Sequence, residues 1–344
     1  MLPLSFIYGM IVMLRNKLFD TGVLESRTYS LPVISIGNLT VGGTGKTPLT
    51  EYVIRLLKDR YSLALLSRGY KRKTKGVIIA APLNTADEIG DEPKQIQSKF
   101  PGITVAVAEK RTEGIERLLD YAKPEVIVMD DAYQHRYVKP GFSVLLIDYH
   151  RPIWKDHPFP AGNLREPASG RKRADVIVVN KCPVTLTASE RDRIIQKIKP
   201  SGTQSVFFTA IEYLKPVDLD GKGQSIPPDS EVLVLAGISQ PDVFIGHLSD
   251  KYKISDTVIY PDHYSFSKKD YLYIKNKLGK TEGGRRIIIT TEKDMVRLKN
   301  MPWLEDDVSK RIWYIPIRLN FLFEEENKFN QLIYSYVEKN KKDS

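Results

Sequence analysis

The stretch that decides the fold is ISIGNLTVGGTGKTPLTEYVIRLL, residues 34–57. It opens with an apolar run, which predicts a strand buried on both faces, and it closes with the pattern of a helix. Between them, Gly42, Gly43 and Gly45 let successive backbone N–H groups converge on phosphate oxygens, and the helix N-terminus adds its dipole. The stretch therefore predicts a phosphate-binding loop. Its expected nucleotide-binding residues are Thr40, Val41, Gly42, Gly43, Thr44, Gly45, Lys46 and Thr47.

Two side chains at the start of the helix carry the chemistry of this loop. Lys46 is placed to reach the β- and γ-phosphates of a nucleotide, and the Thr47 hydroxyl is placed to bind Mg²⁺. The motif G-x-x-x-x-G-K-[ST] has one defect here, because Thr40 stands where its first glycine is expected. The strand and helix on either side compensate for that departure, and a glycine turn without a ligand is the alternative.

The chain has 344 residues, with 52 Lys and Arg against 42 Asp and Glu, which gives a formal net charge of +10. With 42% hydrophobic and 27% charged residues, its composition is that of a folded, water-soluble protein and excludes a disordered chain. The length exceeds the roughly 250–300 residues at which one core stops growing, so two domains are expected. A single cysteine, Cys182, excludes an intramolecular disulfide and fits a reducing compartment. The positive charge predicts an anionic partner: nucleic acid, membrane or a small acidic molecule.

The first 19 residues are densely apolar, and their basic residues Arg15 and Lys17 come at the end. A secretory signal carries its positive charge before the apolar stretch, so this stretch is not one. It is shorter than the roughly 20 residues of a membrane-spanning helix, which argues against a span. Two interpretations remain: a helix buried in the core, or a helix that lies in a membrane interface with its basic end toward the headgroups.

Short apolar runs alternate with helical patterns along residues 25–204. Continuous Val, Ile and Leu runs indicate strands covered on both faces, and intervening helices indicate parallel βαβ units. We therefore predict an α/β fold: a P-loop NTPase-type, mostly parallel sheet with helices on both faces. The predicted strands are 31–38, 61–69, 103–109, 124–131, 142–149 and 174–181.

A second, smaller α/β domain is predicted for residues 231–344, with a helix from about 267 to 278. Residues 205–230 look extended, with a turn at Asp220-Gly221, which predicts a two-stranded β connector between the domains. The smaller domain is expected to close over the active site.

An acidic pair ends one of the buried runs, at the position where P-loop proteins hold magnesium. Asp130 and Asp131 end the run VIVMDD, and carboxylates there bind Mg²⁺ directly or through water. Gln134 and His135 follow just beyond the strand end, where ligands bind in open α/β sheets. The alternative is an Asp pair that caps the next helix.

Two classes of P-loop protein lack their signature residues in this chain. Switch GTPases read guanine through N-K-x-D, whereas the similar string NKCP (180–183) ends in Pro183, which cannot accept the hydrogen bonds of the base. Membrane-associated partitioning ATPases carry a signature lysine at the position of Val41. An ATPase switch of this partitioning type, without a phosphorylated product, remains the competing hypothesis.

Besides the loop with its Pro48, seven short motifs follow one another along the chain. They are SRGYKRK (67–73), GDEP (90–93), AEKR (108–111), DDAYQHR (130–136), FPAGNLREP (159–167), PDHYSF (261–266) and TTEKD (290–294). Together they resemble the tetraacyldisaccharide 4'-kinases, the lipid A kinases of Gram-negative bacteria, over about residues 5–320. Ala132 and Tyr133 depart from the glycine and phenylalanine common in that family, a difference that affects packing.

The resemblance implies an ATP- and Mg²⁺-dependent reaction. Such enzymes transfer the γ-phosphoryl group of ATP to the 4'-hydroxyl of tetraacyldisaccharide 1-phosphate, which gives lipid IVA. It implies that Asp91 of GDEP and His263 of PDHYSF form a catalytic dyad that activates the hydroxyl. These residues lie in different predicted domains, so the dyad would assemble only when the cleft closes, which limits wasteful ATP hydrolysis. Taken alone, a capping carboxylate and a turn histidine are the alternatives.

The other roles follow from the resemblance together with the chemistry of the side chains. Guanidinium groups bind phosphate bidentately, so arginines of the motifs suit an anionic sugar phosphate, with surface ion pairs as the alternative. TEKD (291–294) lies at a predicted strand end in the second domain and is expected to face the cleft or to stabilise the fold, without a more specific role. The expected catalytic residues are Asp91, His263, Lys46 and Asp131; the metal ligands Thr47, Asp130 and Glu166; and the substrate-binding residues Arg111, Arg165, His135 and Asp131.

The basic run RGYKRKTK (68–75) is expected to contact lipid phosphate, with a solvated face as the alternative. No other nucleic-acid signature accompanies it, so no nucleic-acid partner is expected. A lipid substrate also favours the membrane-interface interpretation for residues 1–24. We therefore expect a monomeric, peripheral enzyme on the cytoplasmic face of the bacterial inner membrane, which meets an anionic membrane surface.

Overall fold

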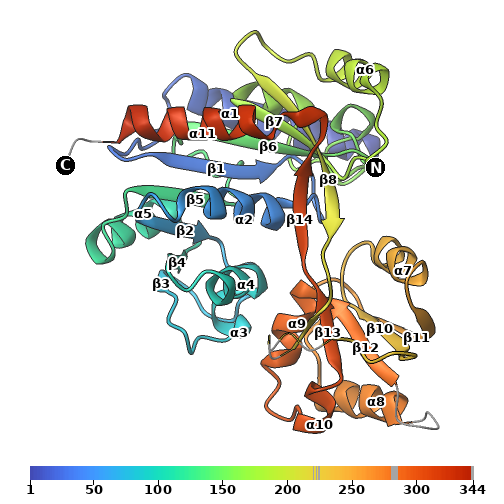
Figure 1. The fold of residues 1–344 in the computed structure, drawn as a ribbon. Coiled ribbons are helices and arrows are strands. Elements are labelled where there is room, and N and C mark those ends of the chain that lie inside the picture. Colours follow the sequence, from blue (N-terminus) through green and yellow to red (C-terminus); the bar gives the residue numbers. More distant parts are fainter. Residues whose placement is uncertain (220, 222, 224, 280–285, 342–344) are drawn as a thin grey trace.

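The computed structural model describes residues 1–219, 221, 223, 225–279 and 286–341. Figure 1 shows two lobes of unequal size, each built around its own β-sheet. Two antiparallel strands join the lobes: β8 (Ser205–Tyr213) runs toward the smaller lobe, and β14 (Ile317–Phe321) returns to the larger one. The predicted α/β class is confirmed.

The larger lobe holds a nine-stranded sheet in the order β14-β8-β7-β6-β1-β5-β2-β4-β3. Its inner strands pair in parallel, and only the two edge strands, β3 and β14, pair antiparallel to their neighbours. Every residue of β1, β2, β5, β6 and β7 is buried, as their continuous apolar runs predict. Besides β8 and β14, the strands are β1 (Val33–Asn38), β2 (Leu63–Ser67), β3 (Ile78–Ile79), β4 (Thr104–Val107), β5 (Val126–Asp130), β6 (Phe142–Asp148) and β7 (Val176–Asn180).

Helices cover both faces of this sheet. Helices α2, α4 and α11 pack on one face, and α5 and α6 pack on the other. The strand order reverses beside β1, so the carboxyl end of β1 is the place where ligands bind in open α/β sheets. The helices of the larger lobe are α1 (Leu2–Asp20), α2 (Lys46–Leu57), α3 (Ala86–Ile89), α4 (Asp91–Lys99), α5 (Arg111–Tyr121), α6 (Ala188–Ile198) and α11 (Glu326–Asn340), with short turns η1 (Ile153–Lys155), η2 (Ala168–Arg173) and η3 (Leu322–Glu324).

The smaller lobe holds a five-stranded sheet in the order β11-β10-β12-β13-β9. Four of its strands are parallel, and β9 at the edge is antiparallel. Apolar clusters fill both faces of the sheet. The predicted helix over 267–278 is confirmed as α8. The elements are β9 (Val217–Asp218), β10 (Glu231–Ala236), α7 (Pro241–Ser249), β11 (Lys253–Ile259), α8 (Lys268–Gly279), β12 (Arg286–Thr291), α9 (Glu292–Lys299), α10 (Asp306–Ser309) and β13 (Ile312–Ile315).

The connection between the lobes differs from the predicted hairpin over 205–230. Strand β8 pairs antiparallel with β14, from Tyr213 opposite Ile317 to Thr209 opposite Phe321. The second strand of the connector therefore comes from the far end of the chain, while β9 joins the smaller sheet beside β13. The predicted turn residue Asp220 lies outside the described residues.

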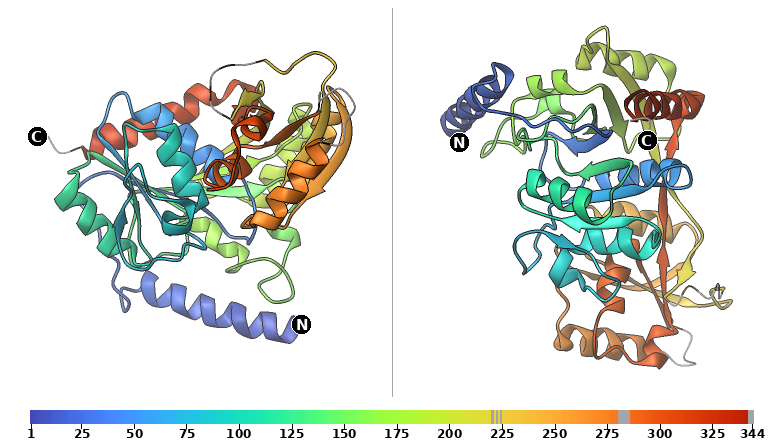
Figure 2. Two further views of the ribbon diagram at one scale, coloured as in Figure 1. Left: turned by 90° about the horizontal axis from the view of Figure 1, so that it is seen from below. Right: turned by 90° about the vertical axis from the view of Figure 1, so that its left-hand side faces the viewer.

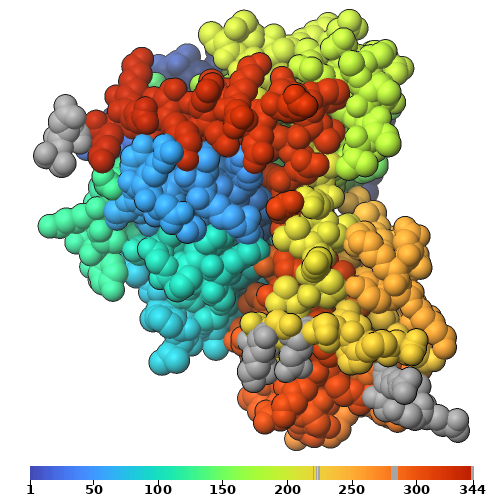
Figure 3. Space-filling view, viewed as in Figure 1, coloured from blue at the N-terminus to red at the C-terminus, as the bar shows by residue number. Residues whose placement is uncertain are grey.

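The chain returns to the larger lobe after β14, so the predicted boundary of 231–344 for the smaller domain is wrong. Phe329, Ile333 and Val337 of α11 are fully buried in the same apolar cluster as α2 and β1. The Tyr336 hydroxyl accepts a hydrogen bond from the backbone N–H of Val33 at 3.0 Å. Figure 3 shows α11, in red, lying across α2, in blue. The apolar stripe of an amphipathic helix does not reveal which sheet it covers.

Helix α1 lies along the outside of the larger lobe (Figure 2). Its apolar residues Phe6, Ile7, Ile11 and Leu14 are exposed, so the interpretation of a core helix is wrong. Its 19 residues and its composition pass the test for a membrane-crossing helix, so the sequence-based argument against a span does not hold either. On its attached side, the Tyr8 hydroxyl donates to a backbone carbonyl of the larger lobe at 2.8 Å. One face thus contacts the protein, and the opposite face is apolar and uncovered.

Candidate active site

A cavity of about 1080 Å³ lies between the two lobes, at the carboxyl ends of β1 and β5. The larger lobe contributes residues 41–48 and 130–131 to its wall, and the smaller lobe contributes 238–240, 262–263 and 291–293. The cavity has the size of a site for a nucleotide together with part of a second substrate. It joins the phosphate-binding loop to residues of the other lobe.

The loop after β1 is held in shape by the ends of two strands. Gly42 and Gly45 have φ angles of +90° and +87°, in the region that favours glycine. Asn38 donates from Nδ2 to the Thr44 hydroxyl at 2.8 Å, and Asn180 donates from Nδ2 to the Thr44 carbonyl at 3.0 Å. A Cβ on Gly45 would lie 2.0 Å from the Asn180 amide nitrogen. This turn therefore needs glycine for its conformation and for the close approach of Asn180.

Asp131 meets two cations at the mouth of the loop. Lys46 Nζ lies 3.5 Å from Asp131 Oδ1, and Arg165 Nη1 donates to both Asp131 oxygens at 3.0 and 3.1 Å. Burial acts to raise the pKa of Asp131, but Lys46 and Arg165 outweigh it and hold this pKa below its usual range. Asp131 is therefore an ionised carboxylate next to the loop lysine.

Asp130 lies deeper, at the end of β5, where its Oδ1 accepts a hydrogen bond from the Thr50 hydroxyl at 3.0 Å. Burial, together with the charge of Asp131, raises the pKa of Asp130 to about 6. A divalent cation beside the pair would offset both effects, and hard oxygen donors with the Thr47 hydroxyl nearby suit Mg²⁺. Among the described residues, no group of three or more His, Cys, Asp or Glu side chains can hold a metal. A Mg²⁺ ion here would therefore share its ligands with nucleotide phosphates.

Glu166, predicted as a metal ligand, has a different set of partners. Its Oε1 accepts hydrogen bonds from Arg173 at 2.9 Å and from the Gln134 amide at 3.0 Å, and its Oε2 accepts one from Asn16 at 2.8 Å. The residue is 1% exposed, and Arg173 neutralises its charge. These contacts attach α1 to the loop after β5, and the structure does not support the metal role.

Arg111, predicted to bind substrate, is likewise turned into the protein. It is 2% exposed, and its guanidinium donates to the backbone carbonyls of Ala108 and Asp130. Burial lowers the pKa of Arg111 to about 10, which leaves it charged at neutral pH. The structure does not support a contact with substrate. Arg111 instead places a positive charge behind the acidic pair.

Arg165 and His135, the other predicted substrate-binding residues, both line the cavity. Burial, with the charges of Arg111 and Arg68, lowers the pKa of His135 to about 4. His135 is therefore a neutral imidazole at physiological pH, able to donate one hydrogen bond and accept another.

The basic run 68–75 divides between the cavity and internal ion pairs. Arg68 and Lys71 line the cavity, whereas Arg72 pairs with Glu109 at 2.6 Å and Lys73 pairs with an aspartate of α3. Arg68 and Lys71 are thus the residues of this run that line the cavity, and the contact of the run with lipid phosphate stays a prediction.

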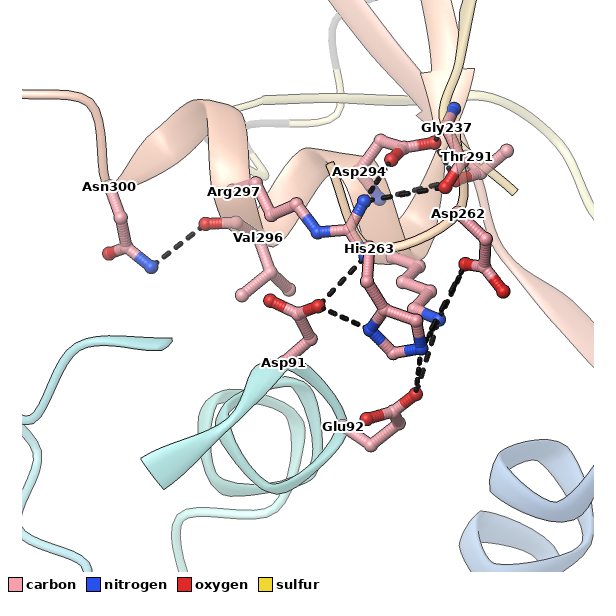
Figure 4. Close-up of polar contacts among 11 residues, drawn as sticks. Asp91, Glu92, Gly237, Asp262, His263, Thr291, Asp294, Val296, Arg297 and Asn300 are labelled. Atoms are coloured by element: carbon pink, nitrogen blue, oxygen red, sulfur yellow. Dashed lines mark hydrogen bonds and ion pairs between the residues drawn. The ribbon is translucent and has the colours of Figure 1, made fainter. Parts of the chain in front are cut away.

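The predicted dyad is assembled at the contact between the lobes (Figure 4). Asp91, the first residue of α4, meets His263, which follows β11, with Asp91 Oδ2 2.9 Å from His263 Nδ1. Burial acts to raise the pKa of Asp91, but hydrogen bonds from His263 and Arg297 outweigh it and hold this pKa well below its usual range. The ring of Tyr70 packs edge-on against His263, with the ring centres 5.2 Å apart.

Several residues at the site escaped the sequence analysis. Lys293 of the TTEKD motif contacts His263 Nε2 at 2.9 Å, and Arg297, three residues beyond that motif, donates to Asp91 at 2.8 Å. Lys181 donates to the Gly43 carbonyl at 2.5 Å and to Asp148 at 2.9 Å. The sequence does hold a signal for Lys293 and Arg297: they are four residues apart in a helical pattern that follows a strand, and cations at that spacing share one helix face.

Comparison with known proteins agrees with this site. The family model for Tetraacyldisaccharide-1-P 4'-kinase matches residues 1–338. The tetraacyldisaccharide 4'-kinase of Bacteroides thetaiotaomicron is 43% identical over 99% of this chain and 94% of that protein, and the one of Flavobacterium johnsoniae is 44% identical over 98% and 96%.

A solved structure matches both lobes. The crystal structure of LpxK from Aquifex aeolicus in complex with ATP aligns with a TM-score of 0.76 and 31% identity over 98% of each chain. These matches span the whole chain and do not favour the partitioning-type ATPase. His263, the partner of Asp91, lines the same cavity as the phosphate-binding loop, and the family model spans both lobes, so the chain belongs to the tetraacyldisaccharide-1-P 4'-kinase family.

Proposed function

We propose that this protein transfers the γ-phosphoryl group of ATP to the 4'-hydroxyl of tetraacyldisaccharide 1-phosphate, which gives lipid IVA. The observation that carries the proposal is the assembled Asp91–His263 pair, whose His263 lines the cavity that also holds the phosphate-binding loop. A kinase needs its hydroxyl-activating group and its phosphate site on one cavity, because the attacking oxygen, the phosphorus and the leaving oxygen must be in line.

The larger lobe would hold the nucleotide. Backbone N–H groups of the loop 42–45 and the start of α2 would bind the phosphates, and Lys46 would move from Asp131 to the β- and γ-phosphates. Ile211 and Tyr213 line the end of the cavity toward the connector and offer an apolar surface to the adenine ring. Mg²⁺, held by Thr47 and by Asp130 or Asp131 together with the phosphates, would neutralise developing charge.

The dyad would activate the acceptor. Asp91 would take the proton of the 4'-hydroxyl while the oxygen of that hydroxyl attacks the γ-phosphorus of ATP. The bond between the γ-phosphorus and the β–γ bridging oxygen breaks, and ADP leaves. Arg165 and the neutral His135 would contact the phosphoryl group or the sugar from the opposite wall. Arg68 and Lys71, at the cavity, would meet the anionic lipid.

The acyl chains would stay in the membrane, to which α1 would attach the enzyme. The uncovered apolar face of α1 suits the headgroup–acyl boundary, and Lys17 lies in its last turn for contact with anionic headgroups. We place the protein as a peripheral, monomeric enzyme on the cytoplasmic face of the bacterial inner membrane, where ATP is available.

The test is an assay of the purified chain with ATP, Mg²⁺ and the disaccharide 1-phosphate in detergent. Mass spectrometry should detect a bisphosphorylated lipid, and Asp91→Asn and His263→Gln should each lower kcat about 10²–10⁴-fold. Binding of ATP, measured by calorimetry, should change little in both variants. Asp87→Asn, an exposed aspartate on the neighbouring helix α3, is the matched control.

Two results would contradict the proposal. ADP release without a phosphorylated lipid would indicate the ATPase alternative. Near-native kcat in either dyad variant would remove that residue from the catalytic step.

A further inference from the structure

The segment 291–297 of the smaller lobe brings two cations to the Asp91–His263 pair. It forms the end of β12 and most of α9, and it includes the TEKD residues 291–294. We propose that Lys293 and Arg297 are positioning residues that fix a proton on His263 Nδ1 and leave Asp91 Oδ1 free for the substrate hydroxyl. This inference rests on the proposed role of Asp91 as the proton acceptor.

Lys293 determines which imidazole nitrogen carries the proton. An ammonium group has three donors and no acceptor, and Lys293 Nζ lies 2.9 Å from His263 Nε2, so Nε2 accepts. The neutral imidazole then has its proton on Nδ1, which donates to Asp91 Oδ2 at 2.9 Å. The two other contacts of the ammonium are Asp262 Oδ1 at 3.0 Å and Glu92 Oε1 at 3.2 Å. Each of its three protons therefore has an acceptor.

Arg297 fixes the orientation of the Asp91 carboxylate. Its Nη2 donates to Asp91 Oδ2 at 2.8 Å, the same oxygen that accepts from His263. Figure 4 shows the other oxygen of Asp91 pointing away from His263. That oxygen, Oδ1, has no hydrogen-bond partner among residues 1–219, 221, 223, 225–279 and 286–341. The protein thus leaves this oxygen unpaired, beside the cavity-lining residues Glu92 and His263, and a substrate hydroxyl that reaches Asp91 would contact it.

The support of Arg297 is itself buried and rigid. Asp294, which is fully buried, accepts from Arg297 Nη1 at 2.8 Å through Oδ1. Its Oδ2 accepts from the Gly237 backbone N–H at 2.8 Å and from the Thr291 hydroxyl at 2.7 Å. This network ties α9 to the end of β10, so both cations sit on one fixed element of the smaller lobe.

Opposite charges from the two lobes are paired around the dyad when the lobes meet. The anions are Asp91 and Glu92 on α4 and Asp262 before His263, and the cations are Lys293 and Arg297 on α9. The contact of Lys293 with His263 lies within the smaller lobe, whereas the contacts of His263 and Arg297 with Asp91 form together as the smaller lobe meets α4. The active proton arrangement of the dyad is thereby linked to the contact between the lobes.

The experiment compares Lys293→Met with Lys293→Arg, and with Lys299→Met as an exposed control on the same helix. Lys293→Met should lower kcat about 10- to 100-fold and change KM for ATP and for the lipid much less, because Lys293, although it lines the cavity, contacts His263, Asp262 and Glu92 rather than the phosphate-binding loop. Lys293→Arg keeps a donor toward Nε2 and should restore kcat to within about fivefold of the native chain. Arg297→Lys, which retains the charge but loses the second donor to Asp294, should lower kcat as well, by about tenfold.

A second readout is independent of turnover. Long-range ¹H–¹⁵N spectra of histidine-labelled protein report which ring nitrogen is protonated, and the His263 signals are assigned by their loss in His263→Gln. The native chain and Lys299→Met should show the Nδ1-protonated ring, and Lys293→Met should show a mixture of the two tautomers or an Nε2-protonated ring.

Native kcat in Lys293→Met, or a ring in that variant protonated as in the native chain, would overturn the proposal. A native chain that does not phosphorylate the lipid would instead overturn the proposed function. The spectra are recorded without substrate, so the two failures are distinguishable.

Discussion

The phosphate-binding loop and His263 of the Asp91–His263 pair line one cavity, but the loop and the pair are assembled from different parts of the molecule. The loop lies between β1 and α2, and Asn38 and Asn180 hold it, so all of its supports belong to the larger lobe. The pair joins α4 of the larger lobe to the residue after β11 of the smaller lobe. Its two supporting cations come from α9.

This difference separates nucleotide binding from phosphoryl transfer. The hydrogen bonds that Asn38 and Asn180 make to the loop lie within the larger lobe, whereas the dyad needs the two lobes in contact. An enzyme built this way holds ATP without the means to activate an acceptor until the second lobe is in place, which limits hydrolysis by water. Variants of the two regions should therefore fail in different ways.

The largest effect is expected from the loop. Lys46→Met removes the cation that reaches the β- and γ-phosphates and should lower kcat about 10³-fold or more. It should also weaken ATP binding in calorimetry, which the dyad variants should not do. Lys58→Met, an exposed lysine at the end of the same helix, is the control. A kcat of Lys46→Met above a tenth of the native value would contradict the central role of the loop in stabilising the charge of the transferred phosphoryl group.

The second effect concerns the contact between the lobes itself. Lys99, in the last turn of α4, pairs with Glu51 of α2 at 2.7 Å and with Glu292 of α9 at 2.5 Å. Both carboxylates are almost fully buried, and Glu292 Oε2 has no hydrogen-bond partner within the described part of the chain. Lys99→Met leaves Glu292 without a cation and should reduce the free energy of unfolding by about 3 kcal/mol.

Urea unfolding measures this loss, with Lys197→Met in the last turn of α6 as the exposed control. Under assay conditions where the variant stays folded, kcat should fall more than the affinity for ATP does. If ATP affinity and kcat fall equally, nucleotide binding by the loop depends on the smaller lobe. Nucleotide binding and phosphoryl transfer would then not be separate properties of the two regions.

What could be predicted from the sequence follows the same division. The apolar runs 31–38 and 124–131, the glycine turn between β1 and α2 and the acidic pair after β5 are local patterns, and the structure contains each of them. The partner of β8 is β14, more than 100 residues away along the chain, and no local pattern indicates that pairing.

Charged residues show the limit most clearly. Arg111 and Arg165 are both arginines in short motifs, yet one is buried against backbone carbonyls and the other lines the cavity. Glu166 and Asp131 are both acidic residues of short motifs, yet Arg173 pairs with the first and the loop lysine with the second. Burial depends on the tertiary fold, so the sequence could name these residues without assigning their roles.

The smallest change in the free energy of unfolding is expected from Glu292→Gln. This change should be opposite in sign to the change that Lys99→Met causes. Burial, with the charge of Glu51, raises the pKa of Glu292 in the folded protein. A carboxyl whose pKa is raised on folding binds its proton more tightly in the folded state, so the protein loses stability as pH rises above the ordinary value of about 4.3. The amide removes this loss, while Lys99 keeps Glu51 at 2.7 Å.

At pH 7.5, Glu292→Gln should therefore be as stable as the native chain or more stable by about 1 kcal/mol, and this difference should shrink as the pH falls toward 4.5. Urea unfolding of both proteins at the two pH values is the measurement. A loss of more than about 2 kcal/mol at pH 7.5 would mean that the ion pair with Lys99 outweighs the burial of two carboxylates beside one lysine. The ion pairs of Lys99 with Glu51 and Glu292 would then stabilise the contact between the lobes. The dyad would depend on ion pairing, as the contact of Lys46 with Asp131 does.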